Sequence, residues 1–171
     1  EIVVTIAGRQ STRYVLRDLG YSGGMSGGAG GELMAVETGR TLAQAPVELP
    51  AVLRPVVDLG PANARQRVVL SGDGKSFDMN RVDLETVVGR VELWDLINTT
   101  FMDHPIHIHG TQFQVVARTV RGLAAPVTYS AWLDTVNVPA GETITIKMMQ
   151  TLPGKRMFHC HILPHEDAGM M

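Results

Sequence analysis

Hydrophobic and polar positions alternate over short stretches through much of the chain, which predicts β-strands rather than helices. In the N-terminal part the predicted strands are residues 2–6, 14–17 and 32–36. In the C-terminal part they are residues 66–70, 86–98, 112–120, 132–138 and 142–149. No stretch with a helical period is longer than about two turns. The sequence therefore predicts an all-β fold, and the short spacing of the later strands is typical of a β-sandwich.

The chain is expected to hold one complete domain and part of another. Its 171 residues suit one domain of common size plus a remnant. Three strands at the N-terminal end are too few to close a β-domain, and the glycine-rich stretch 23–31 between them predicts a flexible loop. We therefore assign residues 1–48 to the end of a preceding domain, 49–64 to a proline-containing linker and 65–171 to a C-terminal domain.

Composition excludes several classes of protein. A hydrophobic fraction of 44% and a net charge of −2 indicate an ordinary globular chain without a basic surface for nucleic acid. No run of about 18 apolar residues is present, so no membrane span is expected. The single cysteine leaves no partner for a disulfide within the chain. A strand pattern begins directly after Glu1 without a signal peptide, so we expect the natural N-terminus to lie elsewhere.

Metal-ligating residues are concentrated near the C-terminal end. The only cysteine, Cys160, lies between His159 and His161 and is followed by His165 and Met170. Thiolate, imidazole and thioether are the ligands of a blue copper centre, because soft sulfur holds Cu(I) while imidazole suits both oxidation states. We predict that the cysteine, the later histidine and the methionine bind one copper ion.

An earlier motif supplies the remaining candidate ligands. His104 is the candidate for the second imidazole of the blue site. Side chains alternate between the faces of a strand, so His107 and His109 share one face, and His159 and His161 share the face opposite to the cysteine. The two pairs are expected to face each other. Together they would form half of a multinuclear copper site, directly beside the copper thiolate.

An isolated cysteine is usually a small buried hydrophobe, but all six histidines of this chain lie in the two motifs. The motifs read His-Pro-x-His-x-His-Gly at residues 104–110 and His-Cys-His-x3-His-x3-Gly-Met at residues 159–170. They resemble the C-terminal domain of multicopper oxidases, the laccase and cuprous oxidase family, and its bacterial members in particular. The resemblance covers roughly residues 75–171. It implies a cupredoxin-like Greek-key β-sandwich, preceded by the tail of another cupredoxin domain.

The resemblance also implies a role for each ligand. A type 1 copper would be bound by His104, Cys160, His165 and Met170, a type 2 copper by His107, and a type 3 pair by His109, His159 and His161. Electrons from a small-molecule reductant (a phenol, an aromatic amine or Cu(I)) would pass from the type 1 copper through Cys160 to a trinuclear cluster that reduces dioxygen to water. Met170 as the axial ligand implies a modest reduction potential.

Glu166 is the second residue, with Cys160, for which we expect a catalytic role. Its carboxylate lies beside a ligand in the sequence. It would either relay protons to the oxygen site, as the resemblance to bacterial cuprous oxidases implies, or hold a histidine N–H beside the metal.

The ligand count falls short of a whole enzyme. In the family the trinuclear cluster uses eight histidines, and this sequence offers four once the blue site has taken two. The other four are expected from N-terminal cupredoxin domains of the same protein. We therefore interpret the sequence as a fragment of a multicopper oxidase, and family resemblance places that protein in the periplasm or outside the cell.

Two rival functions fit parts of the pattern. A stand-alone cupredoxin electron carrier would have no use for four histidines outside the blue site, and a nitrite-reductase-like trimer would not use His161 directly after the cysteine.

A cuprous oxidase for copper tolerance is a third alternative, because Met102 falls near the blue site, where it would bind Cu(I) or simply fill a gap in the core. Thr100 stands where those enzymes tend to place an acidic residue, so a general laccase-like oxidase is favoured. For Trp132 and Asp134 we expect only a packing role.

Overall fold

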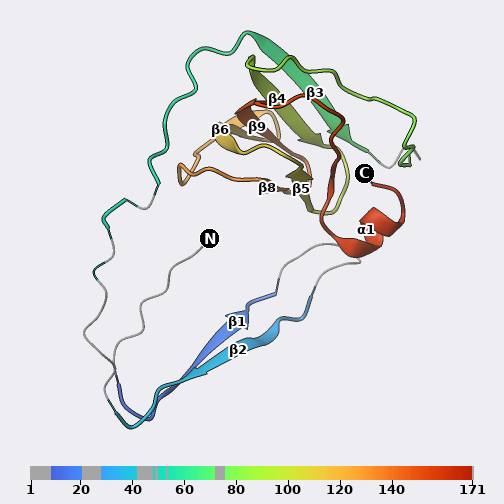
Figure 1. The fold of residues 1–171 in the computed structure, drawn as a ribbon. Helices are drawn as coiled ribbons and strands as arrows, with labels where there is room; N and C mark the ends of the chain where they lie inside the picture. Colours follow the sequence, from blue (N-terminus) through green and yellow to red (C-terminus); the bar gives the residue numbers. More distant parts are fainter. Residues whose placement is uncertain are drawn as a thin grey trace. The chain divides into compact units, whose positions relative to one another are not determined.

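The computed structural model describes residues 9–20, 28–41, 48, 50–52, 54–71 and 76–170 (Figure 1). These residues fall into two compact units, one reaching to Pro55 and one starting at Val56, and each is described by itself. The predicted strand at residues 2–6 and most of the glycine-rich loop lie outside the described residues. The division into the end of one domain, a linker and a C-terminal domain stays a prediction.

The N-terminal unit contains an antiparallel pair of strands, β1 (Arg13–Asp18) and β2 (Gly31–Glu37). Both strands were predicted at these places. The pair is mostly exposed, and Glu32 binds two arginines across it, with contacts of 3.1 Å to Arg13 and 3.0 Å to Arg17. Among the described residues of this unit the sheet has two strands, and a two-stranded sheet buries little hydrophobic surface.

The C-terminal unit is built from two sheets and one short helix. The larger sheet has the order β3-β4-β9-β6-β7, in which β3 (Ala64–Leu70) runs parallel to β4 (Val91–Asn98) and the other neighbours are antiparallel. Its remaining strands are β6 (Phe113–Val120), β7 (Leu123–Ala125) and β9 (Glu142–Met149). The smaller sheet has the order β10-β5-β8, with β5 (His104–Ile108), β8 (Thr135–Val138) and β10 (Phe158–Cys160). The helix α1 (Leu163–Asp167) follows β10 directly.

The hydrophobic core lies between the inward faces of these two sheets, as in a β-sandwich. The larger sheet contributes Trp94, Leu96, Phe113, Ile144, Ile146 and Met148, and the smaller one Ile106, Ile108, Val136, Val138 and Cys160. Because side chains alternate along a strand, the residues between these core positions point to the outer face of the smaller sheet. His107 projects outward from the smaller sheet because Ile106 and Ile108 on either side of it point into the core. The predicted all-β fold is confirmed.

Some strand boundaries were predicted wrongly. The strand expected over residues 86–98 begins only at Val91, because Gly89 adopts a positive φ of 79° in a turn that is closed by a hydrogen bond from Arg90 N to Val87 O. The strand expected over residues 132–138 begins at Thr135. Strand β3 starts at Ala64, one residue inside the expected linker. The short elements β7 and α1 were not predicted.

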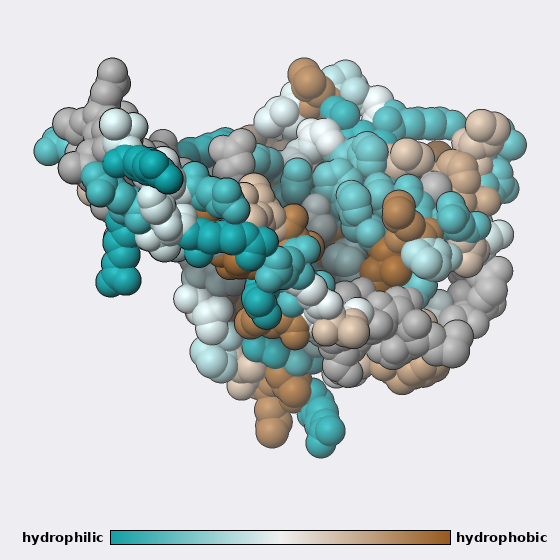
Figure 2. Space-filling view, turned by 90° about the horizontal axis from the view of Figure 1, so that it is seen from below, coloured by the Kyte–Doolittle hydropathy of each residue, from teal (hydrophilic) through white to brown (hydrophobic). Residues whose placement is uncertain are grey.

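The surface of the chain carries several large hydrophobic side chains among polar ones. Phe101, Leu123 and Leu163 are each more than two-thirds exposed. Figure 2 shows brown hydrophobic patches separated by teal hydrophilic residues on one face. Within the described part of the chain, no helix is long and apolar enough to cross a membrane.

Candidate metal centre

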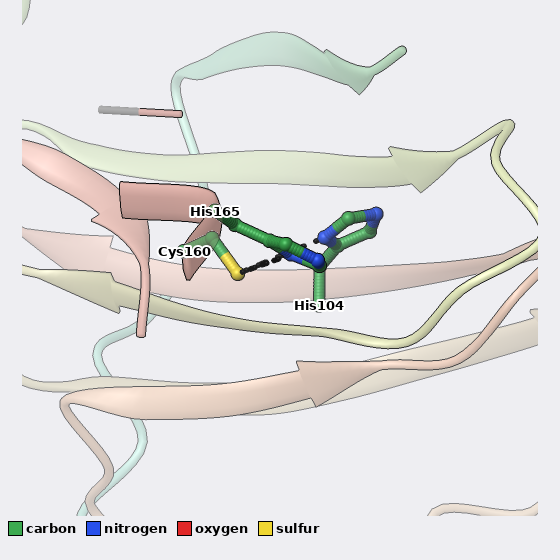
Figure 3. Close-up of side chains that lie close together, drawn as sticks. All are labelled: His104, Cys160 and His165. Carbon is green, nitrogen blue, oxygen red and sulfur yellow. Dashed lines mark hydrogen bonds between the residues drawn. The ribbon is translucent and has the colours of Figure 1, made fainter. Parts of the chain in front are cut away.

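Three predicted ligands of the blue site come together at one end of the smaller sheet. His104 opens β5, Cys160 closes β10 and His165 lies in α1. The Sγ atom of Cys160 is 3.7 Å from Nδ1 of His104 and 3.5 Å from Nδ1 of His165 (Figure 3). All three ligand atoms lie within 4.8 Å of one another. Two imidazole nitrogens and one sulfur atom therefore converge on a single point.

The local backbone explains this convergence. Cys160 pairs with Ile106 in the register of β10 and β5, so its side chain turns into the core, where it is 0% exposed. The chain then folds back through α1, and two hydrogen bonds close the loop: Met170 N donates to His165 O, and Cys160 N donates to Met170 O, both at 3.0 Å. This loop returns His165 to the cysteine that precedes it by five residues.

The sequence did not predict α1, because a helix of five residues is too short to show a hydrophobic period. One signal was present. A proline in the first turn is typical of a helix start, since its missing N–H has no partner there in any case, and Pro164 takes this position.

Met170 completes the set of soft donors around the cysteine. Its side chain is half-buried against the hydrophobic core and lines the same cavity as Cys160. Two histidines and a cysteine with a weak methionine are the donor set of blue copper sites. The side chains present therefore fit a copper ion.

Burial favours the neutral forms of Cys160 and His104. Burial raises the pKa of the Cys160 thiol, and the charge of Glu166 raises it further. Burial also lowers the pKa of His104, and the neighbouring His165 adds to this shift. A metal needs an unprotonated imidazole and a thiolate. His104 is already suited to bind, while the thiol must lose its proton when a cation arrives.

The second group of histidines lies on the outer face of the same sheet. His159 and His107 pair directly in the register of β10 and β5, and Nε2 of His159 is 3.0 Å from Nε2 of His109. These three side chains also bring one ligand atom each within 4.8 Å of the others. The exposed ring of His161 lies at the edge of the group, with its centroid 5.6 Å from that of His159. The structure therefore brings all four histidines to one face, three of them with their ligand atoms close together and His161 beside them.

Contacts at Nδ1 orient the rings of His107 and His159. Nδ1 of His107 lies 2.9 Å from the carbonyl oxygen of Asp134 and 3.0 Å from Oγ1 of Thr135. Nδ1 of His159 lies 3.0 Å from the carbonyl oxygen of Cys160 and 3.7 Å from a carboxylate oxygen of Glu166. In both rings the Nδ1 atom is occupied, which leaves Nε2 for a metal.

Burial lowers the pKa of His109, and the charges of His107 and His159 lower it further. Imidazoles packed this closely disfavour one another's protonation. The lone pair of His109 is therefore available for a cation near neutral pH.

Part of the surroundings of both groups was not predicted from the sequence. Asp134 does not pack: its side chain is 61% exposed and accepts a hydrogen bond from Thr135, while its carbonyl faces His107. The packing role predicted for Trp132 stays a prediction. Thr100, considered only as a departure from an acidic residue, contacts His104 directly, with 2.8 Å between Oγ1 and Nε2.

Comparisons with known proteins agree with this geometry. A family model described as multicopper oxidase matches residues 48–171. A multicopper oxidase of Staphylococcus aureus is 41% identical over 103 residues, which are 58% of this chain and 23% of that protein. A laccase of Bacillus subtilis is 35% identical over 101 residues, 49% of this chain and 20% of that protein. The chain thus spans less than a quarter of the length of these two relatives.

A solved structure extends the comparison to nearly the whole chain. A multicopper oxidase from Campylobacter jejuni, described as a metallo-oxidase, matches with a TM-score of 0.69 and 28% identity, covering 95% of this chain and 40% of that one. The likeness confirms the cupredoxin-like β-sandwich expected from the motifs. With the match to the family model and both histidine groups, it establishes that this chain belongs to the multicopper oxidase family, whose members bind copper.

Proposed function

We propose that this chain provides the type 1 copper site and half of the trinuclear copper cluster of a laccase-like multicopper oxidase. The complete enzyme takes electrons from a reducing substrate and reduces dioxygen to water. One observation carries the proposal. The buried side chain of Cys160 faces His104 and His165, while its neighbours in sequence, His159 and His161, lie with the outer histidines. Copper, when bound, supplies one-electron chemistry by changing between Cu(I) and Cu(II).

The type 1 ligands are His104, Cys160, His165 and Met170. The thiol of Cys160 gives up its proton on binding, and the two Nδ1 atoms that face it provide the imidazole donors. Ile106 and Ile162 are buried beside them and exclude water from the site. A dry shell of this kind, with a thioether as the weak fourth ligand, tunes the reduction potential.

The outer group supplies the cluster ligands. We assign His107 to the type 2 copper and His109, His159 and His161 to the type 3 pair. The close packing of the rings supports this assignment: the centroids of His107 and His109 are 4.8 Å apart, and Nε2 of His109 lies 3.0 Å from Nε2 of His159. Four histidines are half of what the family uses, so the remaining four come from N-terminal cupredoxin domains of the same protein.

The backbone of Cys160 joins the two sites. The peptide bonds on either side of this residue lead directly to His159 and His161, which makes a short covalent route. The contact of 3.0 Å between Nδ1 of His159 and the carbonyl oxygen of Cys160 gives a second connection that bypasses part of the backbone. Cys160, His159 and His161 therefore serve both as ligands and, through their backbone, as the path between the two sites.

Glu166 is proposed to act on protons at the oxygen side. Its carboxylate oxygen lies 3.7 Å from Nδ1 of His159, and its side chain is 25% exposed, so it reaches both the histidine group and solvent. A carboxyl group in this position can take up a proton from water and hold it close to the site of oxygen reduction.

The reductant is proposed to be a phenol, an aromatic amine or Cu(I), with a general laccase-like specificity favoured over a specific cuprous oxidase. A neutral residue, Thr100, binds the outer nitrogen of His104 and offers no charge to attract a cation. A periplasmic or extracellular location is proposed from the family. The runner-up function, a stand-alone electron carrier, leaves the outer histidines without a role.

Copper content and oxygen uptake test the proposal together. The protein that contains this chain with its N-terminal domains is expected to bind about four coppers and to consume oxygen with a phenolic reductant. About one copper and no oxygen uptake would favour the electron carrier. No copper after reconstitution would overturn the ligand assignment.

A further inference from the structure

A hydrogen-bonded cluster holds His104 from the side opposite to the cysteine. The turn between β4 and β5 brings the hydroxyl Oγ1 of Thr100 to 2.8 Å from Nε2 of His104. The other ring nitrogen, Nδ1, faces Sγ of Cys160 at 3.7 Å (Figure 3). The ring is thus fixed between one hydroxyl and one thiol.

Asn98 fixes the position of Thr100. This side chain is only 2% exposed, and its Nδ2 group donates to the carbonyl oxygens of Met102 and Val138, at 2.7 and 2.9 Å. Both partners are acceptors only, so the amide orientation is determined. Its oxygen, Oδ1, then accepts from the backbone N and from Oγ1 of Thr100, at 2.9 and 2.8 Å.

A count of protons then determines the state of His104. The hydroxyl of Thr100 has a single proton to donate. Besides the ring of His104, the acceptors within reach are Oδ1 of Asn98 at 2.8 Å and the carbonyl oxygen of Met102 at 3.1 Å, and neither carries a proton of its own. The contact of 2.8 Å between Oγ1 and Oδ1 joins two oxygens and needs a proton between them, which only the hydroxyl can supply. Nε2 of His104 must therefore be the donor in its contact with Thr100.

We infer that Thr100, held by Asn98, is a positioning residue that keeps His104 in the tautomer with its proton on Nε2 and its Nδ1 lone pair directed at the cysteine. This inference rests on the proposed type 1 copper site. A ligand that is already in the binding tautomer needs neither a proton shift nor a ring rotation when the metal arrives. The hydrogen bond from Nε2–H to Thr100 also makes Nδ1 more basic and so a stronger metal ligand.

Nitrogen-15 NMR of the histidine rings in the metal-free protein, above neutral pH, tests the tautomer directly. Wild-type protein and Thr100→Ser are expected to show His104 protonated on Nε2, and Thr100→Val is expected to show a mixture or the other tautomer. Thr99→Val is the matched control. It removes a hydroxyl of the same loop that bonds Leu70 O at 2.9 Å and does not touch His104. A wild-type ring protonated on Nδ1, or a Thr100→Val ring identical to wild type, would overturn the inference.

Copper binding gives the second readout. Thr100→Val is expected to bind copper at the cysteine site about tenfold more weakly or worse, the usual cost of losing a partner behind a metal-bound histidine. Its reduction potential should rise, since a weaker imidazole donor stabilises Cu(II) less. Thr100→Ser should restore both properties, and Thr99→Val should leave them unchanged. Thr100→Ala replaces Thr100→Val if the latter does not fold.

The two proposals fail in different ways. If wild-type protein binds no copper at Cys160, the proposed function is wrong, and the NMR experiment still decides the tautomer. If wild-type copper binding is normal and Thr100→Val matches it in affinity, potential and tautomer, only the role of Thr100 is wrong.

Discussion

His107 and His159 lie directly opposite each other on β5 and β10, and their rings are 5.5 Å apart between centroids at an angle of 78°. Both project from the face that is opposite to Cys160. A single strand pair therefore carries candidate ligands for two sites, one on each of its faces. Substitutions on the two faces should have separable effects.

Replacing His161 by Ala is expected to lower oxygen consumption more than about 100-fold. Losing a metal ligand should cost more than losing a residue that only hydrogen-bonds to a ligand, which costs about 10- to 100-fold. The visible thiolate-to-copper band should remain, because the exposed ring of His161 packs beside His107 and His159 and is not one of the proposed type 1 ligands. Oxygen uptake and absorption spectra are the measurements. The matched variant His165→Ala should lose the band instead. Loss of the band in His161→Ala would contradict the separation of the two sites.

Replacing Glu166 by Gln is expected to slow oxygen reduction about 100-fold if the carboxyl group relays protons, and to leave the visible band unchanged. Added formate or acetate should restore part of the rate, because a small acid can take over the transfer. Asp167→Asn is the control, since this exposed carboxylate lies next to Glu166 in α1. A slow variant that small acids do not rescue would favour the other role, in which Glu166 holds His159.

Replacing Asn98 by Ala is expected to lower the free energy of unfolding by about 2–4 kcal/mol, because two carbonyl oxygens lose the bond that Asn98 donates and the truncation leaves a buried cavity. These are the carbonyls of Met102 and Val138. Urea denaturation of the metal-free protein measures the change. Asn80→Ala is the control, because Asn80 is exposed. Equal stability of the two variants would show that the cluster around Asn98 contributes little.

The metal-free protein is expected to lose stability as the pH falls below about 6.5, the ordinary pKa of histidine. The pKa values of His104 and His109 are lowered in the folded chain, so the unfolded chain binds protons first. Their contribution is complete above that pH and is lost as the pH falls through the lowered values. The pKa values of Asp58 and Asp95 are also lowered, but these groups titrate below 3.8, outside this range.

Urea denaturation at about pH 7.5 and about pH 5.5 tests this dependence. The double variant His104→Gln, His109→Gln should show a flatter profile between the two values. A double variant with the slope of the wild type would assign the pH dependence to other groups.

The positions of the candidate ligands were predictable from the sequence because they depend on rules that act within a few residues. Strand alternation alone separates Cys160 from His159 and His161, and the structure follows it. The bond between Thr100 and His104 was not predictable in the same way. It depends on the path of a turn and on the buried amide of Asn98, which itself depends on a carbonyl of β8 that lies 40 residues away in sequence. The early start predicted for β4 failed because one glycine turn outweighed the hydrophobic pattern.

The three residues of β10 leave no room for a change of length. Because strand side chains alternate, inserting or deleting one residue next to Cys160 would turn the thiol to the outer face and a histidine into the core. Both donor sets would be dismantled by the same event, whereas a change of length in an exposed loop leaves them intact. Variation among functional descendants of this chain is therefore expected to proceed here by substitution alone, with every gap in an alignment falling outside residues 158–161.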